Sequence, residues 1–244
     1  MTAPAIETIG LTRRYGALTA VDHLNIRVEK GELFALLGVN GAGKTTTIRM
    51  LCCLTKPTEG DATLSGASVV REPMHVKEKI GVSPQETAVA ANLTAEENLR
   101  LMCGMHGLSR AETDEKVRAL SERFHLNEVL SRRAGKLSGG WQRRLSIAMA
   151  LVSDPEILFL DEPTLGLDVI ARSELWDVIR GMKGHATIIL TTHYMEEAEA
   201  LSDRVGVMKD GRLLALGTPD ALKTRTGQEK FEDAFIAIVK GASK

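Results

Sequence analysis

The residues most suited to chemistry lie at positions 38–45, where the sequence GVNGAGKT fits the phosphate-binding pattern GxxxxGK[ST]. An apolar run at Leu33–Leu37 precedes this segment and a helical stretch follows it, which is the context that the pattern requires. Glycines let backbone amides approach phosphate oxygens, Lys44 can reach the β and γ groups, and Thr45 offers a hydroxyl to Mg²⁺. The pattern predicts a nucleotide site, and an ordinary glycine-rich turn is the alternative. The site comprises Gly38, Asn40, Gly41, Gly43, Lys44, Thr45 and Thr46.

A second apolar run, Ile157–Leu160, ends in two neighbouring carboxylates. A phosphate loop needs an acid on a nearby strand to hold the water shell of its metal, so Asp161 is predicted to do this. Glu162 follows at the end of the strand, where a carboxylate can orient an attacking water and accept its proton. Alone, such a pair would indicate solvated loop charge or a helix cap. The phosphate loop in the same chain favours the catalytic interpretation.

A third candidate is the segment Ser138, Gly139 and Gly140, which precedes a helix with apolar periodicity. Exposed amides and a serine hydroxyl at a helix start can bind an anion. The same residues also make an ordinary N-cap, and the residues alone do not decide between the two interpretations.

The elements that position these residues follow from hydrophobic patterning. Alternation over Leu24–Val28 predicts a half-buried strand and an antiparallel opening sheet. The runs Leu33–Leu37, Glu156–Leu160 and Ala186–Thr191 are apolar enough to be strands buried on both faces, with helices between them. The pattern predicts an α/β fold: a P-loop core with a mixed, largely parallel sheet and an N-terminal antiparallel β subdomain.

The middle of the chain has helix-start signals and no buried strand pattern. Thr94 with Glu97, and Ser109 with Glu112, match the capping box. We therefore expect an inserted α-helical subdomain, and a closing helix from the apolar spacing of the tail. The predicted division of this single domain is a core at 1–85 and 138–225, a helical subdomain at 86–137, and a C-terminal helix at 226–244.

Composition restricts the class of partner. Lys and Arg number 31 against 32 Asp and Glu, so the net charge of −1 offers no basic surface for phosphate backbones or anionic lipid. This argues against nucleic acid as the main partner. The apolar runs fall short of the ~18–20 residues of a membrane-spanning helix. The opening residues MTAPAIETIG do not resemble an export signal, so we expect a cytoplasmic protein.

The motifs occur in an order that resembles the ATP-binding subunit of ABC transporters over nearly the whole chain. They are GVNGAGKT, Pro84–Gln85, LSGGWQ, ILFLDEP, Gly166–Asp168 and Thr191–His193. The resemblance implies ATP with Mg²⁺ as the bound nucleotide and hydrolysis as the reaction. It also implies that two such domains pair head to tail, so that Ser138 and its glycines cap the γ-phosphate held by the Lys44 of a second copy.

The resemblance assigns roles that the residues alone do not. Tyr15 corresponds to the aromatic residue that stacks on adenine. Gln85 corresponds to the glutamine that ligates Mg²⁺ and senses the γ-phosphate, and His193 to the histidine that touches this phosphate. Asp168 corresponds to a loop aspartate that communicates between paired subunits. Without the resemblance, Tyr15 would be an edge-strand tyrosine, His193 a strand-end imidazole and Asp168 a turn residue.

The implied partner is a separate transmembrane permease, with this chain peripheral on the cytoplasmic face of the membrane. The sequence of Thr191–Ala198 resembles that of the ATP-binding subunits of drug and lipid exporters, so export is favoured over import. A soluble ATPase of the same family acting on nucleic acid or ribosomes is the rival class. We expect the permease to dock near Leu93–Met105 on the helical subdomain, although Met102 and Met105 could instead fill the core. Trp141 departs from the family, whose signature most often has glutamine there.

Overall fold

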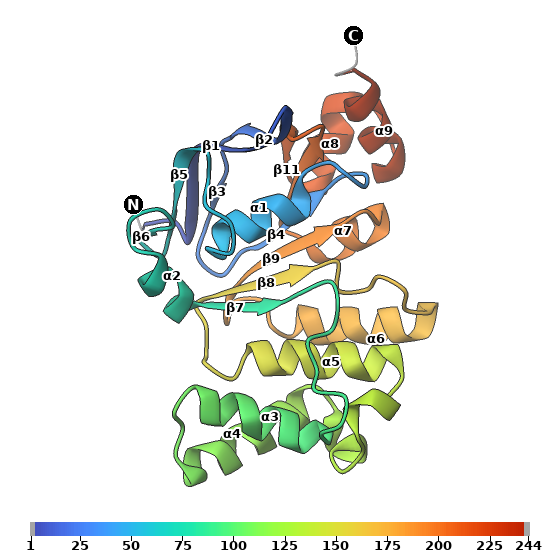
Figure 1. Ribbon diagram of the computed structural model, residues 1–244. Coiled ribbons are helices and arrows are strands. Elements are labelled where there is room, and N and C mark those ends of the chain that lie inside the picture. Colours follow the sequence, from blue (N-terminus) through green and yellow to red (C-terminus); the bar gives the residue numbers. More distant parts are fainter. Residues whose placement is uncertain (1–2, 242–244) are drawn as a thin grey trace.

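The computed structural model describes residues 3–241 and is built around a sheet of six strands (Figure 1). The strand order is β11-β10-β4-β9-β8-β7, and β11 is antiparallel to β10 while the remaining neighbours are parallel. The strands are β4 (Leu33–Leu37), β7 (Ile80–Ser83), β8 (Ile157–Asp161), β9 (Thr187–Thr192), β10 (Arg204–Lys209) and β11 (Arg212–Gly217). This arrangement agrees with the predicted α/β class.

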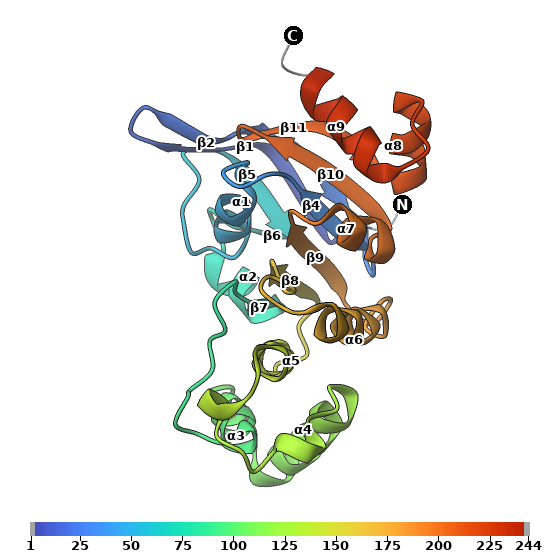
Figure 2. The same cartoon turned by 90° about the vertical axis from the view of Figure 1, so that its right-hand side faces the viewer.

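The central strands are buried on both faces, as their composition predicts. Every residue of β4 is buried because β10 and β9 flank it and helices cover both sides. Parallel strands have their carboxyl ends at one edge of the sheet. The segments that leave β4, β8 and β9 at this edge carry Lys44, Glu162 and His193. In Figure 1 the arrowheads of β7, β8 and β9 point toward this edge, which faces the viewer in Figure 2.

A second, antiparallel sheet forms at the N-terminal side, as predicted. It contains β1 (Ile6–Tyr15), β2 (Leu18–Leu24), β3 (Arg27–Val28), β5 (Glu59–Leu64) and β6 (Ala67–Ser68). The predicted strand over 24–28 is divided between β2 and β3, which both pair with β1. At this break the side chain of Asn25 accepts a hydrogen bond from the amide of Gly10 at 2.8 Å, in place of a backbone ladder bond. The alternation of apolar residues does not reveal such a break.

Helices cover the sheet and form a separate lobe below it (Figure 2). Those that pack on the core are α1 (Lys44–Leu51), α2 (Pro73–Lys79), α5 (Gly139–Ala150), α6 (Val169–Arg180) and α7 (Met195–Leu201). The lobe contains α3 (Ala95–Met105), α4 (Arg110–Arg123) and the short 3₁₀ turns η1 (Leu126–Val129) and η2 (Ala134–Lys136). Both predicted capping boxes begin these helices, at Thr94 for α3 and Ser109 for α4. One continuous apolar cluster joins the lobe to the core through α5.

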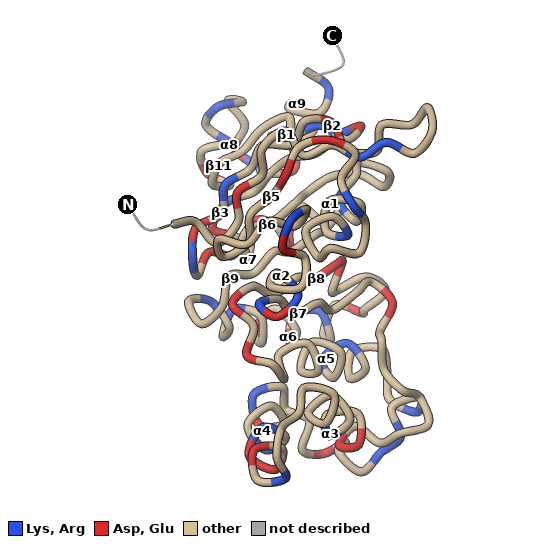
Figure 3. The backbone as a smooth tube through the Cα atoms, turned by 60° about the vertical axis from the view of Figure 1, so that its left-hand side comes forward, with Lys and Arg blue, Asp and Glu red and all other residues tan. Residues whose placement is uncertain are grey.

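The chain closes with two helices, α8 (Pro219–Thr226) and α9 (Phe231–Gly241). Buried Phe231 and Phe235 place α9 against the core, where it contacts α7 and α8. Residues 242–244 of the predicted closing helix lie outside the described residues. Within residues 3–241, no helix combines the length and apolar character needed to cross a bilayer. Figure 3 shows Lys and Arg interspersed with Asp and Glu over both the core and the lobe.

Candidate nucleotide-binding site

A cavity of about 650 Å³ lies at the edge where the parallel strands end. Most of the predicted site residues line it, although they come from five distant segments of the chain. These residues are Tyr15, Asn40, Gly41, Gly43, Lys44, Thr45, Thr46, Gln85, Glu162 and His193. The sheet and the antiparallel subdomain thus bring the predicted nucleotide and catalytic groups together.

Two glycines let the phosphate loop lie close to the strands beside it. A Cβ at Gly38 would come 2.5 Å from the carbonyl oxygen of Met208 on β10. Gly43 has φ +100°, and a Cβ there would come 2.5 Å from the carbonyl oxygen of Ala20. Side chains at these positions would therefore push the loop away from its supports. The helix α1 begins directly after Gly43, so its unpaired first-turn amides and positive end are next to the cavity.

Lys44 is fixed at the floor of the site. Its side chain is 5% exposed, and Nζ donates to the carbonyl oxygen of Gly38 at 2.7 Å. The same nitrogen lies 3.2 Å from Oε1 of Glu162, which forms a buried ion pair. The ammonium group therefore stands between the phosphate loop and the carboxylate that follows β8.

Asp161 is the last residue of β8 and directly precedes Glu162. Its Oδ1 accepts hydrogen bonds from the hydroxyls of Thr45, at 3.3 Å, and Thr191. Burial raises the pKa of the Asp161 carboxyl, and the two hydroxyl donors oppose this rise. A buried carboxylate beside a hydroxyl is the oxygen ligand set that Mg²⁺ prefers, so Thr45 and Asp161 fit this metal.

The backbone of Glu162 has a conformation that few residues other than glycine adopt. Its φ is +47°, and its amide donates to Thr191 at both the carbonyl oxygen, 3.1 Å, and the hydroxyl, 3.0 Å. These bonds hold the strained turn in place. The carboxylate is thereby directed between Lys44 and His193, whose Nδ1 lies 2.9 Å from Oε2.

Tyr15 ends β1 at the outer rim of the cavity and is 43% exposed. The guanidinium of Arg13 lies 4.5 Å from the centre of its ring, a cation–π contact. The neighbouring Leu18, which pairs with Tyr15 across the hairpin, is also exposed and lines the cavity. A flat ring and an aliphatic side chain are therefore available to a planar ligand.

The remaining predicted residues lie outside this cavity. Ser138 is exposed and occupies the N-cap position of α5, but its side chain makes no capping bond. Asp168 does cap its helix, since Oδ1 accepts from the amides of Ile170 and Ala171 at 2.9 Å. The two helix starts adjoin, because a Cβ at Gly140 would lie 3.1 Å from that of Ala171. In Figure 1 the start of α5 is on the same side as the strand arrowheads.

Sequence reasoning missed two residues that hold the site together. Thr191 bonds to both Asp161 and Glu162, and Arg143 donates to the backbone that carries Gln85. Both are polar residues within segments that are otherwise buried. A hydroxyl inside a buried strand, or a charge among the apolar residues of a core helix, is the signal that could have found them.

A glycine loop between a buried strand and a helix, with a lysine facing an acidic strand end, defines a P-loop nucleotide-binding domain. Residues 21–165 match the family described as ABC transporter, which is more than half of the chain. The chain belongs to the ABC transporter family, whose ATP-binding domain binds and hydrolyses ATP. The family and the fold class predicted from the sequence are both confirmed.

Individual relatives of the chain are also ATP-binding proteins of ABC transporters or of drug resistance. The chain is 41% identical over 241 residues to YbhF of Escherichia coli (strain K12), named a probable multidrug ABC transporter ATP-binding protein. It is 43% identical over 224 residues to the daunorubicin/doxorubicin resistance ATP-binding protein DrrA of Streptomyces peucetius. These alignments cover 96% and 91% of the chain, but 41% of YbhF and 68% of DrrA.

A solved ATP-binding subunit of an ABC transporter has the same fold. It superposes with a TM-score of 0.85 at 30% identity, covering 96% of this chain and 99% of the other. The antiparallel subdomain, the parallel core and the helical lobe are thus parts of a known ATP-binding subunit architecture.

Proposed function

We propose that this chain is the ATP-hydrolysing subunit of an exporter, bound at the cytoplasmic face of the membrane to a separate permease. The observation that carries the proposal is the position of the Glu162 carboxylate, held between Lys44 and His193 at the mouth of the phosphate loop. A base in that place can orient a water toward the terminal phosphate. The lysine beside it can neutralise charge that develops on the same phosphate.

Each site residue has a role in this proposal. The loop amides of 38–43 and the start of α1 hold the phosphates, and Tyr15 stacks on adenine. Thr45, Asp161 and Gln85 would hold Mg²⁺, which supplies positive charge to the β- and γ-phosphate oxygens. Entry of a triphosphate gives Lys44 a second anionic partner in addition to Glu162. His193, bonded to Glu162, orients that carboxylate and contacts the terminal phosphate.

The exposed segment Ser138–Gly140, called the signature segment below, supports a head-to-tail pair, which we expect to be a homodimer. Within residues 3–241, the amides of Ser138, Gly139 and Gly140 and the Ser138 hydroxyl donate no hydrogen bond, and these residues do not line the cavity of their own chain. A second copy can supply them to the γ-phosphate, so that ATP binding joins two chains and hydrolysis separates them.

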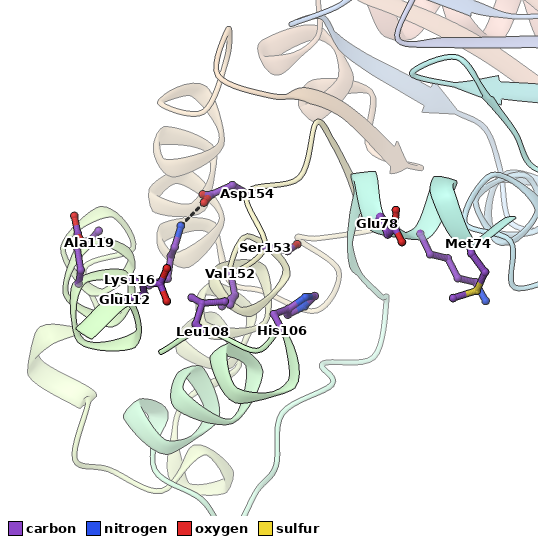
Figure 4. Close-up of a pocket in the computed structure, with 12 residues that line it drawn as sticks. Met74, Glu78, His106, Leu108, Glu112, Lys116, Ala119, Val152, Ser153 and Asp154 are labelled. Atoms are coloured by element: carbon purple, nitrogen blue, oxygen red, sulfur yellow. Dashed lines mark hydrogen bonds and ion pairs between the residues drawn. The ribbon is translucent and has the colours of Figure 1, made fainter. Parts of the chain in front are cut away.

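A groove between the helical lobe and the core supports permease docking (Figure 4). Its volume is about 740 Å³, and it lies between α2, the turn after α3, the helix α4 and the turn after α5. Apolar side chains of Met74, Leu108 and Val152 line it beside charged ones, including Lys116, which pairs with Asp154 at 2.5 Å. An amphipathic cytoplasmic helix of a permease fits such a lining.

This groove differs from the docking segment expected at Leu93–Met105. Met102 is half-buried and packs against the core, which agrees with the core-filling alternative. Met105 is 73% exposed but does not line the groove. We therefore propose that the permease contacts the turn at His106–Leu108, which follows α3, and not the segment Leu93–Met105.

Relatives support export of a drug or another hydrophobic or polymeric substrate. DrrA is named for resistance to daunorubicin and doxorubicin, and another relative for Nod factor export. The cargo itself is determined by the permease.

The test is ATP hydrolysis by the purified chain and by Glu162→Gln. The variant keeps the size of the side chain but cannot accept a proton, so turnover should fall by about 10²- to 10⁴-fold while ATP still binds. Turnover of Glu162→Gln at the parent rate would remove the proposed base.

A further inference from the structure

The segment that carries Gln85 is bound from the helix side by a buried arginine. Arg143, in the first turns of α5, is 4% exposed. Its Nη1 donates to the carbonyl oxygen of Pro84 at 2.6 Å, and its Nη2 donates to that of Gln85 at 2.5 Å. The planar guanidinium fork suits two successive carbonyls, which a single ammonium group cannot span in the same way.

Other contacts of α5 extend this connection along the same segment. The hydroxyl of Ser146 lies 3.1 Å from that of Ser83, at the end of β7. The side chain of Gln142 accepts from the hydroxyl of Thr87 at 3.4 Å. The helix that begins with the signature segment is therefore bonded to the chain before, at and after Gln85.

The buried charge of Arg143 is unusual for a packing residue. Within residues 3–241 its hydrogen bonds are to backbone carbonyls and none is to a carboxylate. Burial lowers the pKa of its guanidinium, and the negative charge of Asp161 opposes this effect. A methionine would fill similar space without the cost of desolvating a charge. The hydrogen bonds to the two carbonyls, and not the packing, therefore account for a charged residue at this position.

We propose that Arg143 is a positioning residue that fixes the backbone at Pro84 and Gln85 and so directs the Gln85 amide at the nucleotide. Gln85 lines the cavity, and its side chain makes no hydrogen bond to another described residue. Among the described residues, the bonds that hold Gln85 in place are therefore to its backbone, from Arg143. The proposal rests on the proposed function, because it assigns Arg143 a role in ATP hydrolysis through Gln85.

The test compares four proteins: Arg143→Met, Arg143→Lys, Gln85→Ala and the double variant Arg143→Met with Gln85→Ala. Loss of a residue that orients a ligand typically lowers activity about 10- to 100-fold, so kcat of Arg143→Met should fall by this amount. The Lys variant should retain more activity than Met, because it can still donate to one carbonyl. The double variant should be within about twofold of Gln85→Ala, because the two residues act through one group.

Binding and stability separate positioning from a structural defect. Arg143→Met should bind magnesium-free ATP as the parent does in a fluorescence titration, but bind the magnesium complex more weakly. Arg204→Met is the control, since the half-buried Arg204 also donates to a backbone carbonyl, that of Arg27, and pairs with Glu32 at the opposite end of the strands from the cavity. Its kcat should stay within about twofold of the parent if loss of a cation that holds a backbone carbonyl has no general effect.

Two results would overturn the proposal: parent kcat in Arg143→Met, or a double variant whose loss is the product of the two single losses. If Arg143→Met does not fold, parent kcat and parent affinity for magnesium–ATP in Arg143→Lys overturn it as well. A parent protein without ATP hydrolysis contradicts the proposed function instead. The two failures are thus distinguishable.

Discussion

The phosphate loop and the signature segment are both expected to contact one kind of ligand, but the fold treats them differently. Lys44 is 5% exposed and bonded to the carbonyl of Gly38 and to Glu162. Ser138 is exposed at the start of α5, and its hydroxyl makes no capping bond. One half of the proposed phosphate site is thus held by bonds within the chain, whereas the segment proposed as its other half is open to solvent. Polar groups without an internal partner are the ones available to another molecule.

The largest effect should come from the completed half. Lys44→Ala removes the cation closest to the Glu162 carboxylate, and loss of one charge-stabilising donor costs about 10²- to 10³-fold in kcat. ATP affinity should also fall, measured by nucleotide titration. Lys56→Ala, an exposed lysine outside the cavity, is the control and should hydrolyse ATP like the parent. Normal turnover in Lys44→Ala would contradict the assignment of the phosphate loop.

The open half should give a different pattern of loss. Ser138→Arg places a bulky side chain on an exposed helix start, so folding and ATP binding should be unchanged while kcat falls by about 10²-fold. Mixing this variant with Lys44→Ala in equal amounts should restore about a quarter of the parent rate, since half of the pairs carry one intact site of two. An ATPase assay of the mixture measures this. Parent activity in Ser138→Arg alone would show that the halves are not shared.

A smaller change is expected at the adenine end. Tyr15→Ala should raise KM for ATP by about 5- to 100-fold with little change in kcat, because base stacking on an aromatic ring contributes about 1–3 kcal/mol. Tyr15→Phe keeps the ring and should resemble the parent. Steady-state kinetics with ATP measure both. Equal KM values in the Ala variant and the parent would place the base elsewhere.

The smallest effect concerns stability. Because burial raises the pKa of Asp161 above its ordinary value of 3.8, the folded state binds a proton more readily than the unfolded state. The free energy of unfolding therefore falls as the pH rises through the interval between 3.8 and the raised pKa of the folded state, and it stays lower at neutral pH. Asp161→Asn does not ionise, so it should raise Tm at pH 7 by about 2–4 °C, or about 1 kcal/mol for a chain of this length.

Thermal unfolding across pH tests this sign. The gain of Asp161→Asn over the parent should shrink as the pH is lowered through this interval and vanish below 3.8, where the parent carboxyl is protonated in both states. A gain that is independent of pH would contradict the argument. The same variant should lose magnesium-dependent hydrolysis, since an amide is a weaker ligand than a carboxylate.

Local signals in the sequence were sufficient for the buried strands and for both capping boxes of the lobe. Leu33–Leu37 is apolar at each position because strands flank it on both sides, and this pattern is visible without the structure. The resemblance of motif order supplied Gln85 and His193, which no local pattern marks as functional. The break between β2 and β3 was not predictable, because it coincides with a hydrogen bond from the amide of Gly10 to the side chain of Asn25.

The residues that sequence reasoning missed act through other residues. Thr191 and Arg143 bond to backbone or carboxylate groups far away in the chain, at Asp161–Glu162 and at Pro84–Gln85. Their partners are known only once the strands and α5 are placed side by side. The groove at His106–Leu108, proposed as the docking site, likewise depends on how the lobe meets the core, which helical periodicity does not determine.

The carboxyl ends of the parallel strands and the start of α5 lie on one side of the molecule. In the proposed pair, a single face of each copy would therefore both hold one phosphate and cap the phosphate held by the other copy. Two such faces would match each other by a half-turn, which leaves no unmatched part of this face to recruit a third copy. We therefore expect association through this face to stop at pairs, so that a higher protein concentration yields more pairs and no filaments.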